Sequence, residues 1–257
     1  MKKMTSILFL LLFSKNAFPA ELVPPSPQLT SASSVITVPT MANTPGALGG
    51  IFKTKVVLYN PTVFSYPIQV SLYSTNGLVE QKTIEMSAGQ IRNYENFLQD
   101  VFAFGGAGAV NFDSLSLPGG NSKLVFLVNS EVYIDSDKGR FKTVVMNGIP
   151  LDPVSPGINA YSTGITADSS NRVNIGFFNA SSIANVIVAE VYDSSNKVLR
   201  TVSTTLGGGS WGQVPLDTFV TGGYIAWKPS SSAYCYAVVV NNTSNDGSFI
   251  PAASYVP

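Results

Sequence analysis

The chain has 257 residues, of which 45% are hydrophobic and only 12% are charged, with equal numbers of acidic and basic side chains. This length and apolar content supply one large or two ordinary domains with real cores, and so weak a surface field makes neither a nucleic acid nor an anionic membrane a natural partner. Histidine is absent and cysteine occurs once, which excludes the commonest general base and zinc ligand, an intramolecular disulfide and a paired thiol.

Residues 1–20 have the three parts of an export signal peptide. Two lysines precede an apolar run over residues 7–13, and alanines stand at 17 and 20. The run is too short to span a bilayer as a helix. Cleavage after Ala20 removes three of the 15 basic residues and leaves 12 against 15 acidic ones, a net charge of −3. The sequence therefore predicts a bacterial cell-envelope or secreted protein, periplasmic or extracellular, with no membrane span after cleavage.

Residues 21–34 are rich in Pro, Ser and Thr and predict a flexible leader. A first module is expected over residues 35–148. Within it, apolar alternation predicts strands at 53–59 and 66–73. The pair Asn60-Pro61 ends the first of these strands because proline cannot donate to a ladder, and Asn76-Gly77 turns the chain after the second because this pair tolerates positive φ.

The second half of this first module is expected to contain one helix and more strands. Apolar residues recur at steps of three and four over residues 91–104, which predicts a short helix. Strands are expected at 109–112, 123–132 and 141–145. Residues 149–158 hold the richest Pro/Gly stretch of the interior and predict a linker between domains.

A second module, over residues 159–257, repeats the order of the first. The run RVNIGFFNASSIANVIVAEVY is a weaker copy of FKTKVVLYNPTVFSYPIQVSLY, and both Asn60 to Asn179 and Tyr73 to Tyr192 are separated by 119 residues. The segment 211–216 is expected to take the place of the helix. Many short strands, frequent turns and little helix indicate an all-β fold: two tandem immunoglobulin-like or fibronectin-like antiparallel β-sandwiches.

Aromatic residues of the second module are the candidates for contact with a ligand. Trp211, Tyr224 and Trp227 are singled out because sugar rings stack on aromatic faces, although core packing explains such residues as well. The lone Cys235 stands in the apolar run AYCYAVVV, which predicts a buried thiol.

Two other motifs admit a functional and a structural interpretation. Asp135 and Asp137 give half of a calcium-loop pattern, but Lys138 interrupts it and no bidentate acid follows, so a solvated hairpin tip is the alternative. The segments beginning at Asn179 and Asn241 match the N-glycosylation pattern, which is common by chance.

No catalytic residue, cofactor or metal is predicted. Serine has no histidine to activate it and no G-x-S-x-G elbow, and no spacing singles out a carboxylate pair among Glu80, Glu85, Glu95 and Asp100. The sequence thus predicts a non-enzyme that acts by surface binding to a protein or glycan partner, in adhesion, the envelope or an extracellular structure. The alternative is a carbohydrate-active or other accessory enzyme with a carboxylate pair.

The segments TPGALGGIFKTKVVLYNP and NNTSNDGSFIPA resemble a tandem repeat family of bacterial exported proteins. In that family PG-x-x-G-x-F/W-K/R-S/T leads into a VxLxNP strand, and each module closes on FIPA. The matching residues are Pro45, Gly46, Gly49, Phe52, Lys53, Thr54, Asn60 and Pro61 in the first module, and Arg172, Asn174, Asn179, Phe249, Ile250, Pro251 and Ala252 in the second. Ala180 replaces the proline, and the first module ends in FKTVV. The resemblance implies exported tandem sandwiches without an assigned enzymatic role.

Overall fold

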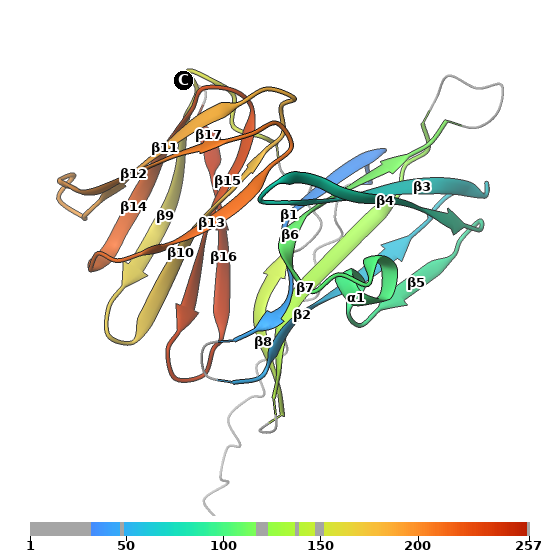
Figure 1. The fold of residues 1–257 in the computed structure, drawn as a ribbon, viewed down its shortest axis with the longest axis horizontal. Coiled ribbons are helices and arrows are strands. Elements are labelled where there is room, and N and C mark those ends of the chain that lie inside the picture. The colour runs from blue at the N-terminus through green and yellow to red at the C-terminus, as the bar shows by residue number, and fades with distance from the viewer. Residues whose placement is uncertain (1–31, 47–48, 117–122, 137–138, 147–151, 256–257) are drawn as a thin grey trace, which may run out of the picture.

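The computed structural model describes residues 32–46, 49–116, 123–136, 139–146 and 152–255. The proposed signal peptide and most of the proposed leader lie outside these residues. The all-β prediction is confirmed: the described residues form antiparallel sheets and one helix of six residues. Two sandwiches are visible side by side in Figure 1, and they are called module 1 and module 2 in chain order.

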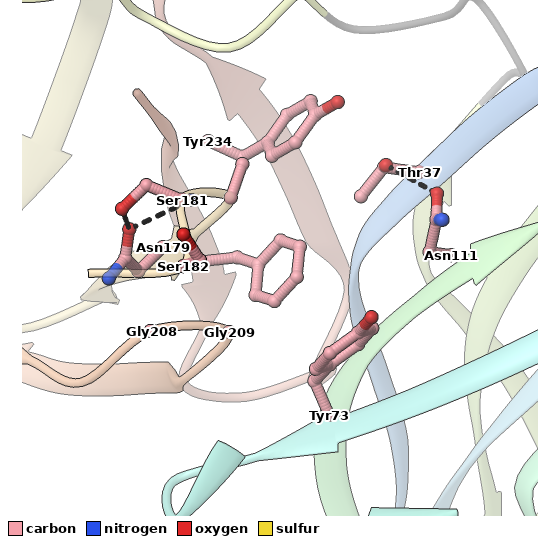
Figure 2. A pocket seen from close by; sticks show the side chains of 11 residues that line it. Thr37, Tyr73, Asn111, Asn179, Ser181, Ser182, Gly208, Gly209 and Tyr234 are labelled. Carbon is pink, nitrogen blue, oxygen red and sulfur yellow. Dashed lines mark hydrogen bonds between the residues drawn. The ribbon is translucent and has the colours of Figure 1, made fainter. Parts of the chain in front are cut away.

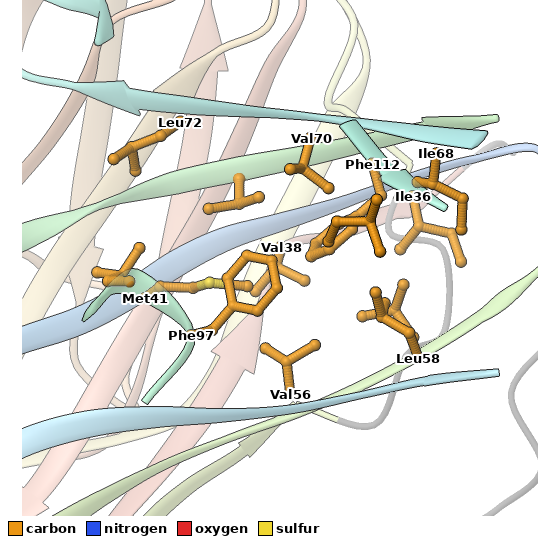
Figure 3. Close-up of a cluster of buried hydrophobic side chains, with 14 of the residues drawn as sticks. Ile36, Val38, Met41, Val56, Leu58, Ile68, Val70, Leu72, Phe97 and Phe112 are labelled. Carbon is orange, nitrogen blue, oxygen red and sulfur yellow. The ribbon is translucent and has the colours of Figure 1, made fainter. Parts of the chain in front are cut away.

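Module 1 is a folded-over sheet of eight strands. Its two layers are β4-β3-β6-β1 and β5-β2-β7-β8, and three residue pairs between β1 and β2 join the layers at one corner. The strands are β1 (Val35–Pro45), β2 (Ile51–Tyr59), β3 (Tyr66–Ser74), β4 (Gly77–Met86), β5 (Ile91–Tyr94), β6 (Gly106–Ser114), β7 (Leu127–Ser136) and β8 (Gly139–Met146). Apolar side chains from both layers meet between them (Figure 3).

Module 2 has the same strand order in two separate sheets. These are β13-β10-β15-β16 and β12-β11-β14-β9-β17. The strands are β9 (Asn159–Ala167), β10 (Asn171–Asn179), β11 (Asn185–Tyr192), β12 (Val198–Leu206), β13 (Trp211–Leu216), β14 (Val220–Pro229), β15 (Ala233–Asn241), β16 (Gly247–Pro251) and β17 (Ala253–Tyr255). Each strand from β9 to β16 therefore has a counterpart eight places earlier in module 1.

The order keeps the centre of an immunoglobulin sandwich and exchanges two of its outer strands. The second strand pairs with the fifth and the third with the sixth in both modules. In immunoglobulin domains the first strand lies beside the second, and the last beside the sixth. Here the first strand pairs with the sixth, and the seventh pairs with the second.

The predicted helix over residues 91–104 is wrong in its first part. Residues 91–94 are strand β5, which pairs with β2 along four residues, and only α1 (Phe97–Phe102) is helical. The spacing of apolar residues at steps of three and four fits a helix. The pairing of residues 91–94 with β2 nevertheless determines their structure, because the same apolar residues can face the core from a strand. Segment 211–216 likewise forms β13, the counterpart of β5, rather than a shortened version of the helix.

A buried asparagine closes the same end of each sandwich. In module 1, Asn60 Nδ2 donates to the carbonyls of Phe64 (2.7 Å) and Ser87 (2.8 Å), while its Oδ1 accepts from the amide and hydroxyl of Thr62 (2.9 and 2.8 Å). Asn60 is fully buried, so these bonds replace all contact with water. The asparagine thereby ties the β2–β3 connection to the β4–β5 turn.

Asn179 repeats this network in module 2. Its Nδ2 donates to the carbonyls of Ile183 (2.8 Å) and Gly207 (2.7 Å), and its Oδ1 accepts from the amide and hydroxyl of Ser181 (3.1 and 2.7 Å). The side chain is fully buried. The glycosylation-like motif at Asn179 is therefore structural, because the amide nitrogen that a glycan needs is enclosed and already bonded.

The two modules dock through one face of the sheet β13-β10-β15-β16. Alternate residues of β15 pack into the core of module 2 and the residues between them pack against module 1: Ala233, Cys235 and Ala237 on one side, Tyr236, Val238 and Val240 on the other. The predicted burial of Cys235 is confirmed, and burial raises the pKa of its thiol well above the usual range. A strand that is covered on both faces has apolar residues at consecutive positions, as β15 does.

Tyr236 is the centre of this interface. Its hydroxyl accepts a hydrogen bond from Trp211 Nε1 (2.9 Å), and its ring lies 5.1 Å from that of Phe249. A Cβ at Gly176 would come within 2.1 Å of the tyrosine ring, so the glycine makes room for it. Val154, inside the proposed linker, is buried and forms an isolated antiparallel β-bridge with Ala233. These contacts make the two modules one packed body.

Candidate binding surface

The two tryptophans singled out in the sequence are buried and do not face solvent. Trp211 lies in the interface between the modules, where it bonds Tyr236. Trp227 lies in the core of module 2, where its Nε1 donates to Ser162 Oγ (3.0 Å) and its ring meets Phe177 edge-on at 5.8 Å. Both aromatic groups serve packing, the alternative already open from the sequence. Tyr224 remains at the surface.

Tyr224 belongs to a row of three half-buried tyrosines on the outer face of module 2. Tyr192 on β11 and Tyr224 on β14 are register partners, with parallel rings at 4.7 Å. Tyr161 on β9 meets Tyr224 edge-on, with ring centroids 5.9 Å apart. Successive side chains of a strand point to opposite faces, and Ala160, Val191 and Ile225, each next to one of these tyrosines, lie in the core of module 2. We call Tyr161, Tyr192 and Tyr224 the tyrosine row.

Sequence reasoning found one member of the tyrosine row and missed two. Tyr161 and Tyr192 are far from Tyr224 in the chain, and only the pairing of β9, β14 and β11 brings them together. The sequence contained one signal for Tyr192. It occupies one of the outward positions of an alternating strand, 119 residues after Tyr73. That spacing relates the tyrosine row to a surface of module 1.

Polar groups fix the ends of the tyrosine row. Tyr192 Oη donates to Glu190 Oε2 (2.7 Å), which also accepts from Lys228 Nζ (2.7 Å). These hydrogen bonds, first from Lys228 and then from Tyr192, hold the pKa of Glu190 below its usual range, and the bond to Glu190 raises the pKa of Tyr192. Tyr224 Oη lies 3.3 Å from Asn196 Oδ1. A hollow of about 210 Å³ lies along the row.

The stacking decides which part of each ring is offered to a partner. Tyr192 covers one face of the Tyr224 ring, and because β14 lies between β11 and β9, Tyr161 approaches it from the other side. A sugar ring needs an open aromatic face on which to stack. In the tyrosine row, stacking closes one face of Tyr192 and one face of Tyr224 to such a ring, so the row suits an apolar protein surface with hydrogen-bonding groups at its margin.

A second hollow, of about 510 Å³, lies between the modules (Figure 2). Tyr73 of module 1 and Phe178 of module 2 meet there, with ring centroids 5.1 Å apart. Thr37 Oγ1 bonds Asn111 Oδ1 (3.0 Å) on the module-1 wall, and Ser181 and Ser182 lie on the module-2 wall. The described side chains around this hollow are polar or aromatic, and Tyr73 and Tyr234 carry its titratable hydroxyl groups.

The carboxylates considered for catalysis are spread over the surface of module 1. Glu80 pairs with Lys82 (2.8 Å) and Glu95 with Lys55 (3.1 Å). Glu85 and Asp100 are exposed, on β4 and α1 respectively. These positions give each acid its own solvated surroundings.

Of the proposed cation loop, Asp135 pairs with Lys53 (2.8 Å), and Asp137 lies outside the described residues. Within the described ranges, no cluster of three or more His, Cys, Asp or Glu side chains could hold a metal ion. The helical part of the same residues contains no segment long and apolar enough to cross a bilayer.

Comparisons with known proteins add little to this geometry. No family model matches the chain, and no curated protein does. Two solved structures show a weak likeness: a Bacteroides uniformis beta-glucuronidase, with a TM-score of 0.15, and Bacteroides uniformis beta-glucuronidase 2 covalently bound to cyclophellitol-6-carboxylate aziridine, with 0.14. Each is 10% identical, and the match covers 79% of this chain but 24% of the other. The chain thus spans about a quarter of those proteins, and likenesses this weak carry no argument.

Proposed function

We propose that the chain is an exported, non-catalytic protein that acts by surface binding, and that the tyrosine row is its binding surface. The observation that carries the proposal is the stacked row of three tyrosines on a sheet face that no other part of the described chain covers. Tyrosine is enriched at protein interfaces because it combines a large apolar ring with a hydroxyl group.

Three further observations support this proposal. The signal-like residues 1–20 favour export, and the chain has no histidine to act as a general base. The shared strand order of the modules agrees with a duplicated sandwich. A protein of this kind contributes to adhesion, to the envelope or to an extracellular structure, and the closed faces of the stacked pair Tyr192–Tyr224 favour a protein partner over a glycan.

The test has two parts. First, expression of the full chain in a bacterium, followed by fractionation, should recover a protein that lacks residues 1–20 outside the cytoplasm. Second, the purified chain without residues 1–20 should bind isolated bacterial cell envelopes, and replacing Tyr192 and Tyr224 together by serine should weaken binding about tenfold or more. Leu78→Ser, at an exposed apolar residue of module 1, is the matched control. Retention in the cytoplasm, or binding equal in the double variant and the control, contradicts the proposal.

A further inference from the structure

The modules stack in the same direction, so the molecule has two different ends. The four layers run in the order β5-β2-β7-β8, β4-β3-β6-β1, β13-β10-β15-β16 and β12-β11-β14-β9-β17 (Figure 1). The second layer of module 1 receives the first layer of module 2. Strand β8, at the edge of the first layer of module 1, also lies against β16. The outward faces of β5 and β2 in module 1, and of β11 and β14 in module 2, meet no other sheet of the described residues.

Each outer layer carries the counterpart of one half of the internal interface. Tyr73 of module 1 packs on Phe178 of module 2. The counterpart of Tyr73 is Tyr192, since both pair with the sixth strand of their module. The counterpart of Phe178 is Tyr59, since both pair with the first residue of the fifth strand of their module.

We propose that the partner of the tyrosine row is a second copy of this chain, which docks there head to tail through an apolar region of module 1. This region consists of Tyr59, Val63, Phe64 and Ile91, and we call it the module-1 tip. The inference rests on the proposed function, because it names the partner of the same surface. In it, Tyr59 of one copy packs on Tyr192 of the next, as Phe178 packs on Tyr73 within the chain.

The module-1 tip consists of large apolar side chains that are exposed at this end of the molecule. Exposure is 82% for Val63, 59% for Ile91, 53% for Phe64 and 36% for Tyr59. Val63 occupies the position of Ser182, which lines the hollow between the modules. An apolar cluster of this kind on one side and a stacked row of tyrosines on the other are complementary surfaces on a single molecule.

The rest of the outer face of module 1 limits how much surface this contact buries. Asn93 and Asn129 stand where Gln213 and Tyr236 stand in module 2. Lys55, in the place of Asn174, pairs with Glu95. Docking along the whole face would desolvate these groups, so the contact is confined to the tip. It is smaller than the internal interface, and association is reversible and rises with concentration.

A contact between two different surfaces does not close on itself after two copies. Such heterologous interfaces form rings or open chains, depending on the rotation between neighbours. The expected species are therefore dimers that grow into short arrays as the concentration rises, rather than a two-fold symmetric dimer.

The test is sedimentation velocity over a concentration series, with the chain lacking residues 1–20. Wild type should show concentration-dependent growth. Tyr192→Ser removes one surface and Tyr59→Ser the other, so each variant alone should self-associate about tenfold more weakly. An equimolar mixture of the two should restore dimers, because one intact tip meets one intact tyrosine row, but should not restore longer species. Val63→Ser, in a loop, repeats the tip test without touching a strand, and circular dichroism checks that each variant folds.

The outcomes separate this inference from the proposed function. Restoration of dimers by mixing supports head-to-tail association. Self-association that persists in Tyr59→Ser and Val63→Ser but disappears in Tyr192→Ser means that two tyrosine rows face each other, which overturns the inference and keeps the binding surface. A wild-type chain that stays monomeric but binds envelopes or a glycan array through Tyr192 also overturns the inference alone. Envelope binding and self-association that are both unaffected by every variant overturn both proposals.

Discussion

The sheets β5-β2-β7-β8 and β13-β10-β15-β16 have the same strand order and different outer faces. On β15 the outward residues Tyr234, Tyr236, Val238 and Val240 are aromatic or aliphatic and lie against module 1. On β7 the corresponding residues are Leu127, Asn129, Glu131 and Tyr133. Strand pairing therefore does not decide whether a module docks on its neighbour. The difference on these strands lies in two positions, where Asn129 and Glu131 of β7 stand in place of Tyr236 and Val238 of β15.

The largest expected effect comes from the feature that the two modules share. Replacing Asn60 or Asn179 by alanine leaves several buried carbonyl and hydroxyl groups without a donor or acceptor, and should destabilise the fold by about 3 kcal/mol in either case. Urea unfolding followed by circular dichroism measures this. The effect at Asn179 should be the larger, because Asn185 Nδ2 also contacts it at 3.3 Å. A change in the free energy of unfolding of less than about 1 kcal/mol at either position would show that the two asparagines do not play equivalent roles.

The next effect separates the two sheets. Gly176→Ala places a methyl group against the ring of Tyr236 and should destabilise the protein by about 2 kcal/mol through overpacking of the interface. The counterpart residue in module 1 is Val57, where a larger side chain is already accommodated. Val57→Ala, the matched control, should change the free energy of unfolding by less than about 1 kcal/mol. Equal effects in the two variants would show that the interface tolerates the added volume.

A smaller effect isolates one hydrogen bond of the interface. Tyr236→Phe removes the hydroxyl that accepts from Trp211 Nε1 and leaves a buried indole N–H unpaired, so we expect a loss of about 1.5 kcal/mol. Tyr161→Phe, in the tyrosine row, is the control and should be near neutral. Thermal unfolding of both variants checks the difference. A neutral Tyr236→Phe variant would mean that water replaces the lost acceptor.

The smallest effect at neutral pH concerns Tyr66, whose counterpart in module 2 is the non-titrating Asn185. Tyr66 Oη donates to the carbonyl of Val125 (2.7 Å), and burial raises the pKa of Tyr66 to about 12. An unfolded tyrosine titrates near pH 10, so the unfolded state loses its proton first. The stability present below pH 10 is therefore lost as the pH rises towards 12.

The Tyr66→Phe variant tests this dependence. At pH 7 it should lose about 0.5 kcal/mol, the value of one hydrogen bond to a partly exposed carbonyl. Between pH 10 and 12 its stability should fall less steeply than that of wild type. Identical slopes in the two proteins, measured by urea unfolding across this range, would assign the alkaline loss to other groups, such as the buried Tyr236 and Cys235, whose pKa values burial also raises.

Local patterns in the sequence predicted much of the fold. Alternation at residues 66–73 gave a strand, and the glycines of the turns before β5 and β13 have the positive φ that such turns need, +65° at both Gly89 and Gly209. The predicted helix is too long because the side chains of Tyr94, Phe97 and Phe102 can face the core whether residues 91–94 form a helix or a strand. A single strand cannot reveal whether its second face meets solvent or another module, and this ambiguity is why the sequence leaves both a ligand contact and packing open for Trp211.

The tyrosine row could not be read from the sequence for a different reason. Its members come from β9, β11 and β14, and their proximity depends on which strands pair and in which register. Alternation assigns each tyrosine to an outward face without saying which strands are neighbours. The 119-residue spacing relates Tyr73 to Tyr192, but the role of Tyr73 in docking follows only from its contact with Phe178.

The last strand, β17, has a mechanical consequence. It pairs antiparallel with β9, and Tyr255 at the end of one lies opposite Asn159 at the start of the other. Force applied to the chain before β9 and after β17 therefore acts at one end of this strand pair. It breaks the hydrogen bonds of the pair one after another instead of loading all of them at once in shear. Tension through the backbone would peel β17 away at low force, so an assembly built from this protein would transmit load more safely from face to face than along the chain.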